Sequence, residues 1–234
     1  MSRMDAVPRG RLHAVFFDLD GTLVDSLPDL AASVNELMSV YGLPPHALPT
    51  VRGMIGNGIE KLVERGFAAH GITLDSAELA ERYERMMGIY GRHLTGLTTL
   101  TPGAGEAVRA ARRIGARTGV VTNKPEGFSR TILTHFGLTP DIDIVIGGDS
   151  GYPKKPGPEM LLAACALSGC KPADAVMVGD STADVAAARA AGVPSIILRG
   201  GYTNLSAEEL GGDFIIDGFD ALAGLLSSLQ GAAK

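Results

Sequence analysis

The chain has 234 residues, of which 45% are hydrophobic and 20% charged, and its formal net charge is −5. This is the composition of an ordinary globular protein with a full core, and the lack of a long basic run argues against an extended nucleic-acid-binding surface. The longest apolar stretches have only strand length, which argues against a membrane span. Residues 1–10 carry no apolar segment of the kind that a secretory signal needs.

The sequence contains two cysteines, Cys165 and Cys170, which cannot form a disulfide scaffold. Because they are five residues apart, they are expected to lie on different sides of a helix. We therefore expect two reduced thiols in a cytoplasmic protein.

Short β-branched or aromatic runs alternate with helical patterns along most of the chain. The predicted elements, in order, are strand 12–18, helix 105–113, strand 117–123, helix 127–136, strand 143–147, helix 159–167, strand 175–180, helix 182–191, strand 195–198 and strand 213–216. The strands are almost continuously apolar, as expected for strands buried on both faces of a parallel sheet. The alternation predicts an α/β fold built on a doubly wound, Rossmann-like parallel sheet.

The interval from residue 24 to residue 97 interrupts this alternation, because it contains no clear strand. Helical periodicity instead covers three segments, at residues 28–41, 58–70 and 76–94. In the middle segment the apolar residues share one face of the helix, and they are Ile59, Leu62, Val63, Gly66 and Phe67. Amphipathic helices need a packing partner, so we expect a separate unit standing over the carboxyl ends of the sheet. The predicted division is a helical cap domain at residues 24–98 and a catalytic core at residues 1–23 and 99–234.

Polar residues follow the predicted strands at the edge where open α/β sheets bind ligands. That edge is formed by the carboxyl ends of the strands, so residues from distant parts of the chain meet there. Each residue by itself could cap a helix or close a turn, but their recurrence at successive strands favours one active site. The residues are Asp18, Asp20, Thr122, Asn123, Lys155, Asp180 and Asp184.

These residue types suit metal-assisted phosphoryl transfer. Aspartate is a hard oxygen ligand of the kind that Mg²⁺ prefers, and an aspartate carboxylate can itself accept a phosphoryl group. A lysine and a hydroxyl group can neutralise charge on the phosphoryl oxygens. The five histidines are scattered and do not pair at ligand spacing, which argues against a zinc site.

The segments around these residues resemble the four motifs of the haloacid dehalogenase superfamily, in the order expected for that family. They are FDLDGTLVDS from Phe17, VVTNK from Val120, KP from Lys155 and GDSTAD from Gly179. The resemblance covers nearly the whole chain, from residue 12 to about residue 225. The helical insertion after the first motif is similar to the small cap of the subgroup that includes phosphoglycolate phosphatases.

The resemblance implies a role for each matching residue. Asp18 would be the nucleophile that takes the phosphoryl group, and Asp20 would be the general acid for the leaving alcohol and then the base for the hydrolytic water. Thr122, helped by the backbone of Asn123, would hold a phosphoryl oxygen. Lys155 would neutralise the nucleophile and the phosphate together.

The resemblance also implies a Mg²⁺ ion, held by Asp18, the backbone carbonyl of Asp20 and Asp180, with Asp184 as an orienting neighbour. Dehalogenases of the superfamily lack an acid at the position of Asp20, because a halide needs no protonation. Asp20 therefore favours phosphate-ester chemistry. The membrane ATPases of the superfamily have a lysine where this chain has Leu19.

Substrate choice in this subgroup is made largely by the cap, and the segment RGMIGNG from Arg52 to Gly58 resembles that of bacterial phosphoglycolate phosphatases. Gly56 and Gly58 flank Asn57 at the start of a predicted helix, where exposed backbone N–H groups favour an anion such as a carboxylate. The alternative is a glycine-rich helix start that only packs closely. Arg52 and Lys61 could also meet a carboxylate or simply be solvated.

We therefore expect a phosphatase that hydrolyses 2-phosphoglycolate. Three alternatives stay open: a different substrate (a sugar phosphate, an amino-sugar phosphate or pyrophosphate), a phosphotransferase with the same aspartates, and a non-catalytic phosphometabolite-binding regulator. The sequence GDSG at 148–151 resembles the nucleophile segment of trypsin-like proteases, but that interpretation requires an all-β double barrel. We expect no nucleic-acid or membrane partner, and a monomer or homodimer.

Overall fold

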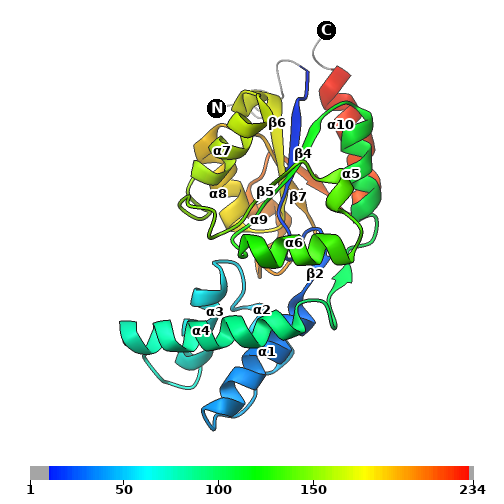
Figure 1. The fold of residues 1–234 in the computed structure, drawn as a ribbon. Helices are drawn as coiled ribbons and strands as arrows, with labels where there is room; N and C mark the ends of the chain where they lie inside the picture. Colours follow the sequence, from blue (N-terminus) through cyan, green and yellow to red (C-terminus); the bar gives the residue numbers. More distant parts are fainter. Residues whose placement is uncertain (1–10, 232–234) are drawn as a thin grey trace.

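The computed structural model describes residues 11–231, so the expectation for residues 1–10 lies outside the described residues (Figure 1). Six parallel strands form the central sheet, in the spatial order β5-β4-β1-β6-β7-β8. This is the order of a doubly wound sheet that reverses direction at its first strand, which confirms the predicted fold class. The strands are β1 (Ala14–Phe17), β4 (Arg117–Val121), β5 (Ile144–Ile146), β6 (Ala175–Gly179), β7 (Ser195–Leu198) and β8 (Phe214–Ile216).

Helices cover both faces of the sheet. The core helices are α5 (Ala104–Arg113), α6 (Glu126–His135), α7 (Glu159–Ser168), α8 (Thr182–Ala191), α9 (Ala207–Leu210) and α10 (Leu222–Gly231), with short 3₁₀ helices at Thr139–Asp141, Pro172–Asp174 and Phe219–Ala221. In Figure 1, α5 and α10 lie on one side of the sheet, and α7 and α8 lie on the other. The four predicted core helices are confirmed to within one residue at each end, whereas α9 and α10 were not predicted.

Side chains of β1 alternate between these two layers. Ala14 and Phe16 belong to a core cluster with residues of α7 and α8, whereas Val15 and Phe17 belong to the larger cluster that includes residues of α5 and α10. All four side chains are fully buried. A strand with helices on both faces has no solvent-facing side, which explains why the strands are apolar throughout.

Between β1 and α5 the chain forms a helical insertion, which lies below the sheet in Figure 1. Its helices are α1 (Leu27–Val40), α2 (Leu48–Arg52), α3 (Ile59–Ala68) and α4 (Ser76–His93). Both α1 and α3 pack against α4, and the predicted apolar face of α3 is buried. The short helix α2 was not predicted.

Two short strands bracket the insertion. β2 (Val24–Asp25) pairs antiparallel with β3 (Thr99–Leu100) where the chain leaves and re-enters the core. The prediction of an interval without a strand was therefore wrong at its first residues, because a two-residue strand carries no periodicity to detect. The exact division between cap and core stays a prediction.

A buried aspartate fastens the start of the insertion to its end. Asp29, in the first turn of α1, is fully buried. Its carboxylate accepts hydrogen bonds from the N–H groups of Leu97 and Thr98, at 2.9 and 2.7 Å, and from the Thr98 hydroxyl group at 2.7 Å. These bonds fix the direction in which α1 leaves the core.

The two cysteines lie close together, so the expectation that they occupy different sides of a helix was wrong. α7 ends at Ser168, and Gly169 takes the left-handed conformation that reverses the chain. The N–H group of Cys170 then donates a hydrogen bond of 3.0 Å to the carbonyl of Cys165. Both are free thiols, and a side-chain hydrogen bond that the Cys165 thiol donates to Cys170, together with burial, raises the pKa of Cys165.

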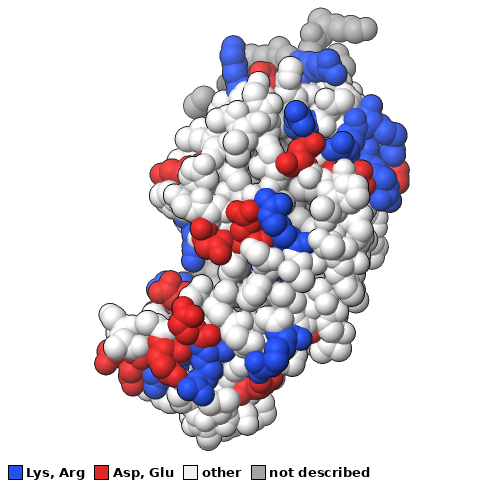
Figure 2. Space-filling view, in the orientation of Figure 1, with Lys and Arg blue, Asp and Glu red and all other residues white. Residues whose placement is uncertain are grey.

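Acidic and basic side chains are interspersed over the face shown in Figure 2, with basic side chains gathered over α5. Those of α5 include Arg109, Arg112 and Arg113, which pair with nearby acids. In the part of the chain that the structure describes, no helix combines the length and the apolar character needed to cross a membrane.

Candidate active site

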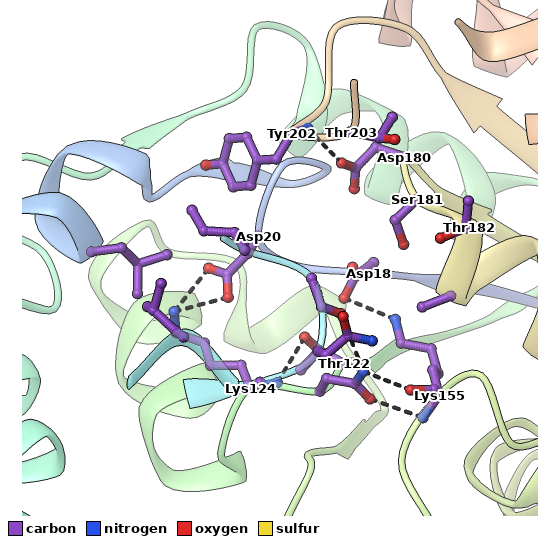
Figure 3. Close-up of a pocket in the computed structure, with 18 of the residues that line it drawn as sticks. Asp18, Asp20, Thr122, Lys124, Lys155, Asp180, Ser181, Thr182, Tyr202 and Thr203 are labelled. Carbon is purple, nitrogen blue, oxygen red and sulfur yellow. Dashed lines mark hydrogen bonds and ion pairs between the residues drawn. The ribbon is translucent and has the colours of Figure 1, made fainter. Parts of the chain in front are cut away.

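The strand-end residues meet at one edge of the sheet, as predicted, and border a cavity of about 480 Å³ between the sheet and the insertion (Figure 3). β1 lies between β4 and β6, whose preceding helices pack on opposite faces of the sheet. The loops after these strands therefore diverge and leave a crevice. Of the predicted residues, Asp184 lies outside the cavity wall, and those that line it are Asp18, Asp20, Thr122, Asn123, Lys155 and Asp180.

Lys155 connects three elements beneath the cavity. Its ammonium group lies 3.0 Å from Oδ1 of Asp18 and 2.6 Å from Oδ1 of Asp184, and it donates a hydrogen bond of 2.8 Å to the carbonyl of Val121. Burial disfavours the charged lysine, but Asp18 and Asp184 outweigh burial and raise the pKa of Lys155. A positive charge is therefore fixed beside Asp18. The neighbouring Lys154 is exposed.

Asn123 clamps the loop that carries Lys155. Its side-chain oxygen accepts a hydrogen bond of 2.9 Å from the Lys155 N–H group, and its side-chain amide donates one of 2.8 Å to the Lys155 carbonyl. Sequence reasoning considered only the backbone of Asn123, so this clamp was missed. The adjacent Thr122 is buried and accepts a hydrogen bond of 3.3 Å from the Lys124 N–H group, which orients its hydroxyl group.

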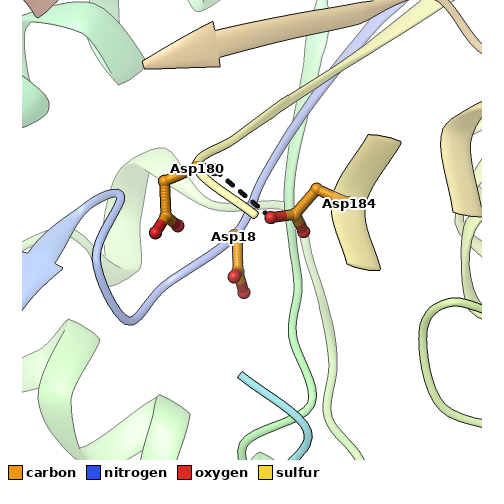
Figure 4. Close-up of side chains that lie close together, drawn as sticks. All are labelled: Asp18, Asp180 and Asp184. Atoms are coloured by element: carbon orange, nitrogen blue, oxygen red, sulfur yellow. Dashed lines mark hydrogen bonds between the residues drawn. The ribbon is translucent and has the colours of Figure 1, made fainter. Parts of the chain in front are cut away.

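Three acids form a cluster beneath the cavity, and two of them, Asp18 and Asp180, line it (Figure 4). One carboxylate oxygen from each of Asp18, Asp180 and Asp184 lies within 4.8 Å of the others. Burial raises the pKa of Asp18 to about 6, against the lowering effect of Lys155. Burial, and then the charges of Asp184 and Asp18, raise the pKa of Asp180 to about 8. The folded chain therefore confines more negative charge here than its own residues neutralise.

Asp184 organises this cluster from the first turn of α8. Its Oδ2 atom accepts hydrogen bonds from the N–H groups of Ser181 and Asp180, at 3.0 and 3.2 Å, and from the Ser181 hydroxyl group at 2.6 Å. Ser181 and Asp184 together form the capping box of α8. With its oxygens occupied in this way, Asp184 is placed to orient its neighbours.

The charge balance of the cavity fits a divalent cation. Four carboxylates, including that of Asp20, face the two ammonium groups of Lys124 and Lys155. Oδ1 of Asp18 is buried and accepts no hydrogen bond of good geometry from the described residues, although the Lys155 ammonium group is close. Hard carboxylate oxygens with excess negative charge suit a divalent ion. Asp18 and Asp180 offer the side-chain oxygens that would hold it.

The Asp20 side chain points away from the acidic cluster. Its carboxylate forms an ion pair with Lys124, with 2.8 Å between Oδ1 and Nζ, and Oδ1 also accepts a hydrogen bond of 2.5 Å from the Ser26 hydroxyl group (Figure 3). Sequence reasoning missed Lys124 as a site residue, although it directly follows Thr122 and Asn123 in the second motif.

Asp180 is held by two residues that sequence reasoning also missed. The Thr22 hydroxyl group donates a hydrogen bond of 2.9 Å to Oδ1, and the N–H group of Tyr202 donates one of 2.9 Å to Oδ2. The Tyr202 hydroxyl group in turn accepts hydrogen bonds from the N–H groups of Ser26 and Leu27, at 2.7 and 3.0 Å. Tyr202 follows β7, the neighbour of β6, so the rule that located the other strand-end residues could have found it.

The insertion contributes the opposite wall of the cavity through the predicted segment Gly56, Asn57 and Gly58. Gly56 and Gly58 have φ values of 128° and 87°, which favour glycine. Arg65 of α3 donates hydrogen bonds of 2.7 Å to the Asn57 side-chain oxygen and to the carbonyl of Met54, and it also lines the cavity. Its role was not predicted.

Two other cations of the insertion make different contacts. Arg52 donates a hydrogen bond of 3.3 Å to the carbonyl of Gly200 and another to that of Gly201, in the loop after β7. The exposed Lys61 pairs with Glu64 at 2.5 Å. Arg52 therefore joins the insertion to the core, and Lys61 lies on a solvated face.

Known proteins share both the sequence pattern and the fold. A family model described as haloacid dehalogenase-like hydrolase matches residues 12–192. A phosphoglycolate phosphatase of Cereibacter sphaeroides is 41% identical over 218 residues, which are 93% of this chain and 99% of that protein. The phosphoglycolate phosphatase of Caulobacter vibrioides is 38% identical over 205 residues, which are 88% of this chain and 86% of that protein.

The similarity extends to solved structures. A crystal structure titled as that of a predicted phosphoglycolate phosphatase from Haemophilus somnus 129PT has a TM-score of 0.85 to this chain at 32% identity, and the match covers 93% of this chain and 98% of that one. The match therefore includes the helical insertion as well as the sheet. With its four motifs, its strand-end site and these relatives, the chain belongs to the haloacid dehalogenase-like hydrolases and is an enzyme.

Proposed function

We propose that this hydrolase is a Mg²⁺-dependent phosphatase that converts 2-phosphoglycolate to glycolate and phosphate through an aspartyl-phosphate intermediate. The observation that carries the proposal is the place of Asp18 in the cavity wall, 3.0 Å from the buried ammonium group of Lys155 and within the acidic cluster. The choice of substrate is supported by relatives named phosphoglycolate phosphatase, of which one is matched along 99% of its length.

In the proposed reaction a carboxylate oxygen of Asp18 attacks phosphorus, and the bond between phosphorus and the ester oxygen breaks as Asp20 gives its proton to that oxygen. Water then attacks the phosphorus of the aspartyl phosphate and gives a proton to Asp20. The bond from phosphorus to Asp18 breaks, which releases phosphate and restores both acids. Asp20 suits these proton transfers because it borders the cavity outside the acidic cluster.

The surrounding residues balance charge during this transfer. In the proposal Thr122, which lines the cavity near Asp18, holds a phosphoryl oxygen, and the fixed charge of Lys155 neutralises the nucleophile and the phosphate together. Asp18, Asp180 and the backbone carbonyl of Asp20 would hold a Mg²⁺ ion. When bound, this ion would neutralise part of the charge on the phosphoryl group. Asp184 keeps Lys155 in position through its contact of 2.6 Å.

The carboxylate of 2-phosphoglycolate would meet the insertion wall of the cavity. There the N-terminus of α3 begins after Gly58, and free N–H groups of a first helical turn attract an anion. Arg65 adds a positive charge to the same wall and holds Asn57 in place. The cavity is lined by Lys124 and Lys155 from the core and by Arg65 from the insertion. A substrate with its phosphate on the sheet side and its carboxylate on the insertion side would account for cations on both walls.

The proposal is tested by phosphate release from the purified chain in the presence of Mg²⁺. We would compare kcat/KM for 2-phosphoglycolate, a set of sugar phosphates, an amino-sugar phosphate and pyrophosphate, with and without EDTA. The expected result is a clear preference for 2-phosphoglycolate that EDTA removes and added Mg²⁺ restores.

Other outcomes separate the alternatives. A sugar phosphate or pyrophosphate at the top of the series would overturn the substrate and leave the phosphatase mechanism standing. Transfer of phosphate to a second sugar in place of water would indicate a phosphotransferase. Tight binding of phosphorylated compounds without phosphate release would favour a regulator.

A further inference from the structure

Lys124 is a buried cation that takes no part in the proposed transfer steps. Its ammonium group lies 2.8 and 3.0 Å from the two carboxylate oxygens of Asp20, and its side chain is only 1% exposed. The Tyr90 hydroxyl group is in hydrogen-bond contact with the same ammonium group. Figure 3 shows the ion pair at the side of the cavity away from Asp180.

The contacts of Lys124 leave it little capacity to bind substrate. An ammonium group has three N–H donors, and the two oxygens of Asp20 and the Tyr90 hydroxyl group are three acceptors around it. A buried ammonium group with these partners is costly to separate from them. Lys124 is therefore better placed to hold Asp20 than to receive the substrate's carboxylate.

The position of Lys124 is itself fixed by the sheet edge. Its N–H group donates to the Thr122 hydroxyl oxygen at 3.3 Å, and its carbonyl accepts a hydrogen bond of 2.8 Å from the N–H group of Gly148 after β5. From there its side chain reaches Asp20 on the loop after β1. The Asp20 carboxylate is thereby restrained at both oxygens, with Ser26 as a further donor to one of them.

Tyr90 brings the insertion into this arrangement. It is a fully buried residue of α4, and its ring packs edge-on against Phe128 of α6 with ring centroids 5.6 Å apart. The Lys124 nitrogen lies 4.5 Å from the centroid of the same ring. One contact between α4 and the core is therefore made by Lys124, the residue that holds Asp20.

We propose that Lys124 is a positioning residue for Asp20, and that Tyr90 makes this positioning depend on how α4 sits against the core. The inference rests on the proposed function, in which Asp20 protonates the leaving oxygen. Proton delivery requires a donor held within hydrogen-bond reach of that oxygen and in the right direction. Esters of alcohols, whose leaving oxygen is strongly basic, depend on such a donor, whereas esters of acidic phenols do not.

The test compares Lys124→Met with the wild-type chain on aryl phosphates that carry no carboxylate. Phenyl phosphate has a basic leaving group and p-nitrophenyl phosphate an acidic one. We expect Lys124→Met to lower kcat/KM, which reports the steps up to departure of the leaving group, by roughly ten- to a hundredfold for phenyl phosphate and by less than about threefold for p-nitrophenyl phosphate, since general acid catalysis contributes about 10²- to 10⁴-fold. Asp20→Asn should show the same dependence on the leaving group, with larger losses.

Matched controls separate positioning from general damage. Lys171→Met removes an exposed lysine that precedes β6 at the opposite edge of the sheet and should leave both substrates unaffected. Because Lys124 acts through Asp20, the double variant Lys124→Met with Asp20→Asn should be no slower than Asp20→Asn alone. Tyr90→Phe keeps the ring contact with Phe128 and should show the same dependence on the leaving group with a smaller loss.

Several results would overturn the inference. Equal losses of kcat/KM on both aryl phosphates would assign Lys124 a merely structural role. A rise in KM confined to 2-phosphoglycolate would make it a substrate contact. If Asp20→Asn itself showed no dependence on the leaving group, Lys124 would have no acid to position. In each case phosphate release by the wild-type chain would still support the proposed function, whereas failure of the wild-type chain to release phosphate would count against that function.

Discussion

The sheet side and the insertion side of the cavity differ in how firmly their residues are held. On the sheet side, Asp18, Lys155 and Asp180 are each at most 9% exposed, and contacts from other segments of the chain fix the last two at several atoms. On the insertion side, Gly56 and Asn57 are exposed, and the segment accepts side-chain hydrogen bonds from Arg65, at 2.7 Å to Asn57, and from Asn123, at 3.4 Å to the carbonyl of Gly56. The residues proposed to break the phosphate ester bond are thus held rigidly in the core. The segment proposed to contact the rest of the substrate belongs to the insertion and is held less firmly.

In the proposed function, this difference separates the residues that carry out phosphoryl transfer from those that contact the rest of the substrate. A change in the insertion segment alters contacts with the distal part of the substrate but leaves the distance between Asp18 and Lys155 unchanged. A change on the sheet side disturbs charges that are buried together. Variants on the two sides should therefore fail in different ways.

The largest effect is expected for Asp18→Asn. Loss of the nucleophile should lower kcat by about four orders of magnitude or more for every phosphate ester, because no other residue replaces it. The melting temperature should stay equal or rise, since burial makes the ionised carboxylate of Asp18 costly and raises its pKa. Phosphate release and thermal unfolding measure the two effects.

The exposed acid Asp220 provides a control for Asp18→Asn. Asp220→Asn should match the wild-type chain in both measurements. Turnover by Asp18→Asn at more than a few per cent of the wild-type rate would remove Asp18 from the nucleophile role.

The acidic cluster should make stability depend on pH and on divalent cations. In the folded chain the pKa values of Asp18 and Asp180 are about 6 and about 8, above the ordinary value of 3.8. As pH rises from about 4 to about 8 the unfolded chain loses these protons before the folded chain does, so the metal-free protein should lose stability across that window. Mg²⁺ should raise the melting temperature more at pH 8 than at pH 6 and restore the activity that EDTA removes.

Asp180→Asn sharpens this measurement. It removes the group with the higher pKa, so the melting temperature in EDTA should fall less between pH 6 and pH 8, and Mg²⁺ should stabilise the variant less than the wild-type chain. Equal dependence on pH and on Mg²⁺ in the two proteins would contradict the assignment of this cluster as the metal site.

A smaller and more selective effect is expected on the insertion side, for Gly58→Ala. At a φ value of 87° the new side chain is strained, and its Cβ atom would lie 3.3 Å from the carbonyl oxygen of Asn123, at the mouth of the cavity. We expect KM for 2-phosphoglycolate to rise about tenfold, the effect of one weakened hydrogen bond to a charged group, with kcat within about twofold. Steady-state kinetics on this substrate and on p-nitrophenyl phosphate measure the change.

Gly71→Ala is the matched control, because Gly71 also has a positive φ value, of 74°, but nothing lies within 4 Å of the added Cβ atom. Both variants should lose about 1 kcal/mol of stability from backbone strain, and only Gly58→Ala should change KM. Equal KM values in the two variants would mean that the segment from Gly56 to Gly58 is a tight helix start without a role in binding.

Much of the sheet side could be predicted from the sequence, because strand ends are readable as points where apolar runs stop at polar residues. Asp18 and Asp180 each come directly after such a run. Lys155 was expected at the same edge because it follows the third predicted strand, although it lies several residues beyond the end of β5 in a loop without periodicity. The side-chain clamp from Asn123 to that loop joins residues 32 positions apart, and local pattern carries no information on such a pair.

The insertion side was predicted less completely. Helices α1, α3 and α4 have clear apolar faces, whereas the five-residue helix α2 and the two-residue strands β2 and β3 are too short for a periodic signal. Arg65 is a half-buried residue of α3. Its contact with Asn57 depends on how the preceding loop folds back.

The sequence by itself determined the α/β fold class, the order of the motifs and the identity of the residues at the strand ends, since hydrophobic periodicity and strand-end polarity are local properties of the chain. Only the tertiary structure decided which charges pair. It places Lys155 between Asp18 and Asp184, and Lys124 between Asp20 and Tyr90. The physical reason is that an ion pair depends on distance and burial, and both are set by segments brought together from across the whole chain.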